Sequence, residues 1–283
     1  MRRRPSGARS ATGRRPHYLA GAGSLVWLFL VGLPLYVMLA ASVRSRSDYA
    51  RRGPLAFPES VTSDNYTGAF TSGFGQYFVN TVIVTVCVVA LVLVLVPPLA
   101  FAIVRSRSRL LSGVFRLFLL GLAIPAQAVI VPMFYLISQA GLYDNLIGVV
   151  LPTAAFCLPV STLILSGTMR DISPELYEAM AMDGAPPRQI FFRLVLPLSR
   201  GGLSTITVFS ALQAWNGFLF PLVLTQSEST KLITLGLYNF QTEHGIDIPG
   251  LLAAVVLSTM PVLLVYLFAR RALVQGLMGV GGK

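Results

Sequence analysis

The stretch ELYEAMAMDGAPPRQIFFRLVLPLSR (residues 175–200) lies between two runs of almost purely hydrocarbon side chains. It carries three acids and three arginines in a chain where only 12% of residues are charged. Such a polar interruption in an apolar chain indicates a segment that lies outside the hydrophobic layer and has a separate task.

Short helix signals divide this stretch into two parts. Ser173-Pro174-Glu175 predicts a helix start, because it offers a hydroxyl cap, a first-turn proline and an acid at the positive end of the helix dipole. Asp183-Gly184 predicts its end, since glycine reverses the chain at little cost. Pro186-Pro187 predicts a second helix start and Leu196-Pro197 its end. The sequence therefore predicts a helix, a sharp turn and a second helix.

Both short helices are expected to be amphipathic. At 100° per residue one face of the first helix carries Leu176, Tyr177, Met180 and Ala181, opposite Glu175, Glu178 and Met182. The apolar face of the second carries Ile190, Phe191, Leu194 and Val195. These patterns fit an element that lies along a membrane surface, and from the residues alone a merely solvated interfacial loop remains an equal alternative.

Outside this stretch the chain is unusually apolar. Of its 283 residues 54% are hydrophobic, and apolar runs of about 20 residues predict membrane-spanning helices. The six predicted spans are residues 19–43, 80–104, 114–138, 147–169, 202–224 and 249–269. The sequence thus predicts an all-α membrane protein with six transmembrane helices. A basic tail, residues 1–18, precedes them and is expected to be disordered.

Basic residues predict the orientation of these spans. Of the 22 lysines and arginines, sixteen fall on the side of both termini, the 105–109 loop and the 170–200 loop, and five on the other side. Arg116 lies in the third run. By the positive-inside rule both termini are expected to be cytoplasmic. The net charge of +11 then has a membrane explanation, and we do not expect nucleic-acid binding. The group from Arg44 to Arg52 on the outer side fits this rule poorly.

Several function classes lack their usual residues here. No Asp, Glu, Lys or His lies in the middle of a predicted span, whereas ion-driven carriers usually keep such a group there. The sequence has no GxxxxGK[ST] phosphate loop and only two histidines, both outside the spans. We therefore predict a non-catalytic chain without a metal site or cofactor of its own. Cys87 and Cys157 are expected to be free thiols packed among apolar residues.

The spacing in the quoted stretch resembles the EAA loop of the membrane subunits of bacterial ABC importers. Glu178-Ala179 and Gly184 match its E-A-A and glycine positions, and Leu194, Leu196 and Pro197 match its I-x-L-P, with Met180 and Leu194 as mild departures. Ala185 stands where many members have a capping hydroxyl residue. In the family this loop docks into a cytoplasmic ATPase. The coupling residues implied are Glu178, Ala179, Met180, Asp183, Gly184, Leu194, Leu196 and Pro197.

Other segments are similar to the carbohydrate-uptake branch, the MalG-like subunits of maltose-type importers. These are AWNGFLFPL (Ala214–Leu222), with glycine where that branch usually has glutamate, TLGLYNF (Thr234–Phe240), RRALVQGL (Arg270–Leu277) and residues 124–152. The resemblance covers about residues 60–283. It implies the type I ABC importer permease fold in a six-span domain over residues 19–283, with a family core at about 77–271 and the coupling loop at 170–200.

The resemblance also implies a function and a set of partners. It predicts a permease subunit of a sugar or oligosaccharide importer in a bacterial cell membrane, which forms the pathway with a second, non-identical membrane subunit. An ATPase dimer binds ATP and Mg²⁺, and a solute-binding protein delivers the substrate from outside. An importer of polyamines, phosphonates or peptides is the alternative, followed by an ion-driven carrier or a membrane enzyme.

Five residues near the end of the fifth span are candidate substrate contacts. Aromatic rings stack on the C–H faces of sugars, and amides recognise their hydroxyls. The candidates are Gln213, Trp215, Asn216, Phe218 and Phe220. Packing of Trp215 and Asn216 within the bundle is the competing interpretation.

Overall fold

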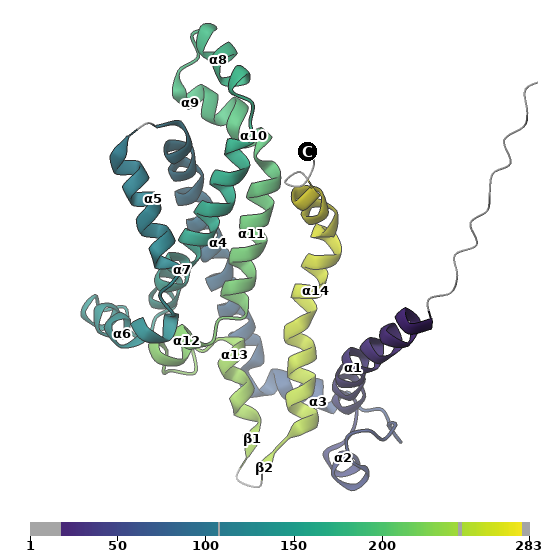
Figure 1. The fold of residues 1–283 in the computed structure, drawn as a ribbon. Coiled ribbons are helices and arrows are strands. Elements are labelled where there is room, and N and C mark those ends of the chain that lie inside the picture. Colours follow the sequence, from purple (N-terminus) through teal and green to yellow (C-terminus); the bar gives the residue numbers. More distant parts are fainter. Residues whose placement is uncertain (1–17, 107, 243–244, 279–283) are drawn as a thin grey trace, which may run out of the picture.

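A computed structural model describes residues 18–106, 108–242 and 245–278 of the chain. The described chain is mostly helical, with one two-residue antiparallel strand pair in which Gln241 is opposite Ile246. Residues 1–17 of the predicted basic tail lie outside the described residues. The long helices run side by side, and shorter elements cap both ends of the bundle (Figure 1).

The elements follow one another along the bundle with short connections. The first part of the chain forms α1 (Tyr18–Ser42), α2 (Arg46–Arg52), α3 (Asp64–Ala69), η1 (Phe70–Phe74), α4 (Gly75–Arg105), α5 (Arg109–Gly121), η2 (Ala126–Val129), α6 (Ile130–Gln139) and α7 (Leu146–Arg170). The second part forms α8 (Pro174–Met182), α9 (Pro187–Ile190), η3 (Phe191–Val195), α10 (Leu196–Leu198), α11 (Arg200–Trp215), α12 (Leu219–Leu224), α13 (Ile233–Gly236), η4 (Leu237–Phe240), β1 (Gln241–Thr242), β2 (Gly245–Ile246) and α14 (Ile248–Met278).

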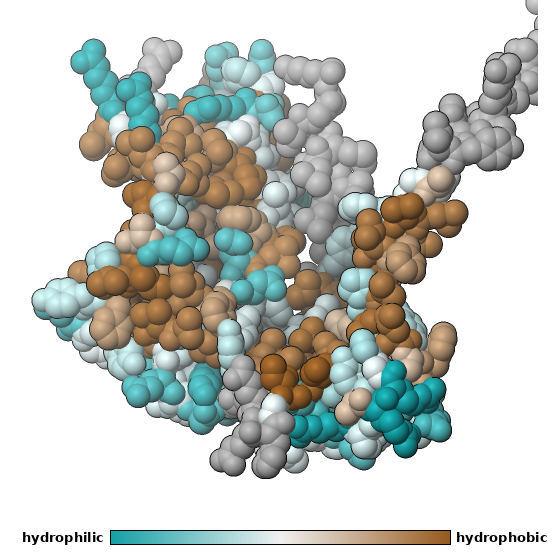
Figure 2. Space-filling model, turned by 60° about the horizontal axis from the view of Figure 1, so that its bottom comes forward, coloured by the Kyte–Doolittle hydropathy of each residue, from teal (hydrophilic) through white to brown (hydrophobic). Residues whose placement is uncertain are grey.

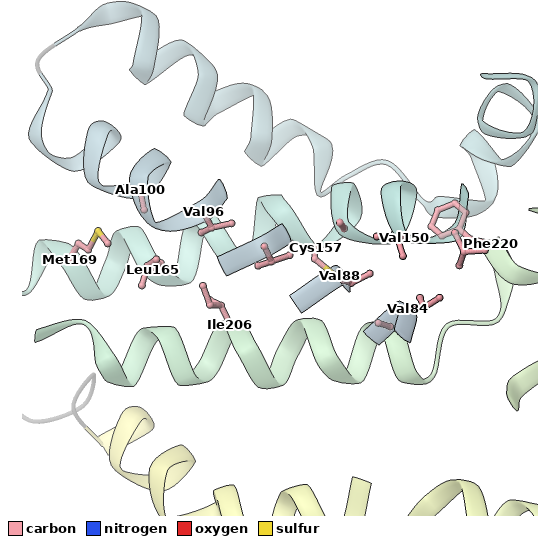
Figure 3. Close-up of a cluster of buried hydrophobic side chains, with 14 of the residues drawn as sticks. Val84, Val88, Val96, Ala100, Val150, Cys157, Leu165, Met169, Ile206 and Phe220 are labelled. Carbon is pink, nitrogen blue, oxygen red and sulfur yellow. The ribbon is translucent and has the colours of Figure 1, made fainter. Parts of the chain in front are cut away.

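The core lies where α4, α7 and α11 meet. One row of α4 side chains at every fourth position is wholly buried, and it consists of Val84, Val88, Val92, Val96 and Ala100. Residues four apart form a ridge on a helix surface, and β-branched valines make that ridge stiff. Figure 3 shows this row facing Cys157 and Leu165 of α7 and Ile206 of α11. The sequence pattern thus produces one tightly packed three-helix unit.

Three helices are long and apolar enough to cross a membrane. They cover Gly21–Ser42, Asp64–Arg105 and Leu146–Arg170, and two bent helix pairs raise this number to as many as five among the described residues. Within the described part of α14, Ile248–Leu264 is a shorter apolar helix. Large apolar side chains also cover much of the outer surface, most densely on α1 (Figure 2). A helix that is apolar all round suits lipid contact.

The third predicted span is not one straight helix. The chain breaks after α5, and the α5 segment meets the segment from Ala126 to Gln139 at an angle of 101°. Pro125 lies in this break, where it cannot donate a backbone hydrogen bond and holds Ile124 out of helical geometry. The fifth predicted span is interrupted as well, since α11 ends at Trp215 and α12 begins at Leu219. The predicted spans 114–138 and 202–224 therefore each contain a break between two helices.

The poorly fitting basic group near the end of α1 has structural roles. Arg44 is fully buried, and its Nε donates a 2.7 Å hydrogen bond to the Asp48 carboxylate. Its terminal nitrogens donate to the carbonyls of Gly53, Ala56 and Asp48. Arg51 and Arg52 form exposed ion pairs with Glu59. Arg44 thus holds the α1–α3 connection together, which explains an arginine at this position without reference to membrane charge.

Both cysteines are free thiols, as predicted. Cys157 packs in the core, but Cys87 is exposed on the surface of α4. The expectation of apolar packing within the chain is therefore confirmed for Cys157 and wrong for Cys87.

Candidate functional site: the loop between α7 and α11

The first short helix begins where the sequence predicts, with Pro174 in its first turn. Its cap differs from the expectation. The Ser173 hydroxyl makes no hydrogen bond to a backbone N–H, and it donates to the Glu175 carboxylate instead. This hydrogen bond lowers the pKa of Glu175 below its ordinary value. Glu175 is thus engaged locally at the helix start.

The turn after α8 has the geometry that its glycine predicts. Gly184 has a φ of +76°, in the region that favours glycine. The N–H of Ala185 donates to the carbonyl of Met180, and the N–H of Gly184 donates to that of Ala181, both at 3.0 Å. These two bonds form a Schellman motif, which satisfies carbonyls at a helix C-terminus. The predicted sharp turn is confirmed.

The second leg is longer than predicted. α9 continues through the π-helical segment η3 into α10, so the helical path ends at Leu198 and not at Leu196-Pro197. Pro197 lacks the N–H that would continue the regular helical ladder, and one wider turn precedes it. The chain then bends by 74° into α11. Helix, turn and helix together lie at one end of the bundle, with α8 farthest out (Figure 1).

Only part of the predicted apolar face of α8 is buried. Tyr177 is 3% exposed and Met180 packs against the core, but Leu176 and Ala181 are exposed. The apolar face is therefore narrower than the sequence pattern predicts. On the second leg all four predicted residues, Ile190, Phe191, Leu194 and Val195, are partly or fully buried, as expected.

The predicted coupling residues fall into two groups. Glu178, Ala179, Asp183 and Gly184 are exposed, whereas Met180, Leu194, Leu196 and Pro197 are partly buried. Beside the first group lies Met182, with 89% of its surface exposed. The loop thus presents a bare face that combines acids, small residues and one large apolar side chain. Its other face anchors it to the bundle.

The candidate substrate residues do not gather at one point. Trp215 is buried, and its Nε1 donates to the Ser258 carbonyl of α14. Phe220 is buried against Phe156 of α7, with ring centroids 5.3 Å apart. Trp215 and Phe220 thus contact neighbouring helices, as the packing interpretation of Trp215 expects.

The other three candidates are more accessible. Gln213 and Asn216 are exposed, and Phe218 stacks on Tyr238 with ring centroids 6.0 Å apart. Phe218 and Tyr238 line a cavity of about 440 Å³ together with Thr234, Leu237, Ile246 and Leu251. A volume of this size lies in the range of small-molecule sites. Tyr238 was not among the predicted residues, because its place opposite Phe218 depends on the fold.

A second cluster, at the opposite end of the bundle from α8, was not predicted either. Asp144 accepts hydrogen bonds from the backbone N–H groups of Gln226 and Ser227 at 2.8 and 3.0 Å. The hydroxyls of Ser227 and Thr230 donate to the same carboxylate. These bonds hold the pKa of Asp144 well below its ordinary value. One carboxylate thus fixes the segment 226–230, which we call the outer loop.

Among the described residues, no group of three or more His, Cys, Asp or Glu side chains is placed to hold a metal ion. The helical bundle joins two structural features, the protruding helical loop at one end and the outer loop braced by Asp144 at the other. An apolar helical bundle with a polar helical loop projecting from one end has the architecture of a membrane protein.

Comparison with known proteins agrees with that class. Residues 97–279 match the family of binding-protein-dependent transport system inner membrane components, and the chain belongs to this family. It is 32% identical to the diacetylchitobiose uptake system permease protein NgcG of Streptomyces coelicolor, over 93% of this chain and 88% of that one. It is 29% identical to the arabinooligosaccharides transport system permease protein AraQ of Halalkalibacterium halodurans, over 91% and 96% of the two chains.

The fold is also shared with a solved structure. A chain in the crystal structure of a bacterial ABC transporter involved in the import of the acidic polysaccharide alginate aligns with a TM-score of 0.80, at 22% identity. The alignment covers 95% of this chain and 99% of that one. The predicted resemblance to ABC importer permeases is therefore confirmed. The chain is an inner-membrane permease subunit and not an enzyme.

Proposed function

We propose that this permease subunit imports a sugar or oligosaccharide. The relatives reported above are named for the uptake of diacetylchitobiose and of arabinooligosaccharides. In this proposal the chain forms the pathway with a second membrane subunit, and a solute-binding protein delivers the substrate from outside. ATP and Mg²⁺ are bound by a cytoplasmic ATPase dimer.

The proposed docking of the loop between α7 and α11 to the ATPase is supported by the exposed face of α8, which lies farthest out at one end of the bundle. Glu178 offers a carboxylate there, and Ala179 and Gly184 leave room for close approach of another backbone. Asp183 and Met182 extend the same face. An acidic and partly apolar protrusion suits a cleft with a basic wall on the ATPase. Met180, Leu194, Leu196 and Pro197 hold this protrusion in place.

The proposed topology has six spans with both termini in the cytoplasm. The bent pair α5–α6, the helix α11 with its continuation α12, and the helix α14 would complete the set that the three long helices begin. This places the basic residues near α8 on the cytoplasmic side. The division into a basic tail, residues 1–18, and a six-span domain, residues 19–283, follows from the same topology.

For the substrate path we propose Gln213, Asn216 and Phe218, with Tyr238 added. The stacked rings of Phe218 and Tyr238 form an aromatic wall of the 440 Å³ cavity, and such a wall can contact the C–H face of a sugar ring. Trp215 and Phe220 shape the bundle behind this wall.

The direct test is uptake by the reconstituted complex. The chain is purified with its partner subunit, its ATPase and its binding protein, and placed in proteoliposomes. ATP-dependent accumulation of labelled diacetylchitobiose or arabino-oligosaccharide is expected, with no accumulation of the polyamine spermidine. Uptake of spermidine and of neither sugar would overturn the sugar proposal.

A further inference from the structure

The last turn of α4 contacts both legs of the coupling loop, which we define as residues 170–200. The Phe101 ring packs on Phe191 of η3, with centroids 5.3 Å apart. The Arg105 guanidinium carbon lies 4.4 Å from the centroid of the Tyr177 ring in α8. Phe101 and Arg105 are four residues apart, so they lie on the same face of α4. A single helix end therefore holds both halves of the loop.

Tyr177 is the point where α8 is attached. Within α8, all of which the structure describes, Tyr177 is the one buried residue. Its hydroxyl is buried without a hydrogen-bond partner among the described residues, so the ring must supply the contact. A guanidinium at this distance over a phenol ring is a favourable cation–π arrangement. The Arg105–Tyr177 contact thus fixes the position of the helix that carries Glu178.

The other end of α4 is attached to the outer loop. Asn80 Nδ2 donates to the carbonyls of Ser229 and Lys231, both at 2.8 Å, and the Tyr77 hydroxyl donates to Glu228. The Tyr77 ring also lies so close to Gly236 that an added Cβ there would be 2.2 Å from it. Gly236 is thus needed for this close approach. The first two turns of α4, the outer loop and α13 after it form one packed unit.

A single continuous helix joins these two attachments. α4 runs without interruption from Gly75 to Arg105, through Pro97 and Pro98, which corresponds to about 45 Å at 1.5 Å per residue. Its buried valine row presses it against α7. One continuous helix thus connects the outer loop to the contacts that hold α8.

We propose that α4 couples the outer loop to the coupling helix α8, and that Arg105 is the positioning residue at the inner end of this link. The proposal rests on the proposed transport function, since the two loops would then face the binding protein and the ATPase. In this arrangement a binding protein that displaces the outer loop shifts α4, and the Phe101 and Arg105 contacts carry that shift to Glu178.

The test measures ATP hydrolysis by the reconstituted complex with and without the binding protein. Arg105→Ala is expected to lower the stimulation by the binding protein about two- to fivefold, the size of an exposed cation–π contact. Basal hydrolysis and the amount of assembled complex should remain at the parent level. Arg105→Lys should retain most of the stimulation, because it keeps a cation. Tyr177→Phe should behave like the parent, because it keeps the ring.

Two comparisons make the result specific. Tyr177→Leu should lose as much stimulation as Arg105→Ala, and the double variant should lose no more than either, because both changes remove one contact. Arg109→Ala serves as the matched control, since this arginine is also exposed and lies at the start of α5, four residues after Arg105. Equal effects of Arg105→Ala and Arg109→Ala, or additive losses in the double variant, would overturn the proposal. Uptake by the parent complex tests the transport function separately. If the parent complex shows ATP-driven uptake, the transport function holds whether or not the Arg105 variants behave as expected.

Discussion

The indole Nε1–H of Trp215 donates a hydrogen bond to the backbone carbonyl of Ser258 at 3.1 Å. This bond joins the last residue of α11 to α14. The ring of Phe78 from α4 meets the same indole edge-on, with centroids 5.7 Å apart. Trp215 thus joins α11 to α4 and α14 at the point where α11 ends, directly before the non-helical residues Asn216 and Gly217.

This junction predicts that Trp215 acts on stability more than on substrate choice. Trp215→Phe removes the hydrogen bond and part of the packed ring, and we expect a loss of about 1–3 kcal/mol in the free energy of unfolding. Thermal unfolding of the purified complex should show a lower midpoint, with unchanged preference between two sugars. Tyr238→Ala is the contrasting variant, expected to raise KM for uptake with an unchanged midpoint. A changed sugar preference in Trp215→Phe alone would contradict this assignment.

The proposed topology predicts where reporter enzymes are active. Fusions after Arg109 and after Arg200 are expected to report the cytoplasm, and a fusion after Gly141 the outside, because basic residues favour the cytoplasmic side. Alkaline phosphatase and green fluorescent protein fusions at the same three positions provide opposite signals. Phosphatase activity after Arg200 would exclude contact between α8 and a cytoplasmic ATPase.

Glu178 is predicted to matter far more than Glu175, although both are exposed acids of α8. Glu178 lies on the bare face, which in our proposal enters an ATPase cleft with a basic wall. Glu178→Ala should therefore weaken ATPase association on the order of tenfold or more. Glu175 already accepts a hydrogen bond from Ser173, and Glu175→Ala should cost only a cap-sized effect. Co-purification of the ATPase and uptake measure both variants. Normal uptake with Glu178→Ala and lost uptake with Glu175→Ala would show that another face of α8 docks.

Gly184 provides a separate prediction about shape. Its φ of +76° disfavours any side chain with a Cβ, although open space surrounds the position where a Cβ would lie. Gly184→Val should therefore distort the turn and reduce ATPase association, with near-normal amounts of protein in the membrane. Gly113→Val on α5, a glycine without positive φ and with similar open space, is the matched control. Equal loss of membrane protein in both variants would indicate a general folding defect instead.

Asp144 predicts a pH dependence of the outer loop. Hydrogen bonds from Ser227, Thr230 and Gln226 lower its pKa in the folded state, so its contribution to stability is complete above the ordinary carboxyl pKa of about 4 and is lost as pH falls below it. Hydrogen exchange of the Ser227 amide, corrected for intrinsic rates, should show constant protection from about pH 8 to pH 5. Asp144→Ala should remove that protection throughout. If protection declines between pH 7 and pH 5, a group other than Asp144 controls the position of the outer loop.

Local signals in the sequence predicted the start of α8 at Pro174 and the turn at Gly184. These features depend on φ preferences and on hydrogen bonds between residues a few positions apart. The EAA spacing was readable for the same reason, because its residues lie within one short segment. The break between α5 and α6 also has a local cause, because Pro125 cannot donate a backbone hydrogen bond.

The sequence by itself determined the apolar helices, the polar loop between the fourth and fifth of them, and the family of transport subunits. Tertiary structure decided which side chains of those helices are buried and which distant residues contact one another. Tyr177 is buried and Leu176 is bare because the end of α4 reaches only one edge of α8. Asp144 meets Gln226 across 82 residues of chain, and Tyr77 meets Glu228 across 151. Helical periodicity repeats every 3.6 residues and carries no information about such distant partners, so only the packed bundle could bring them together.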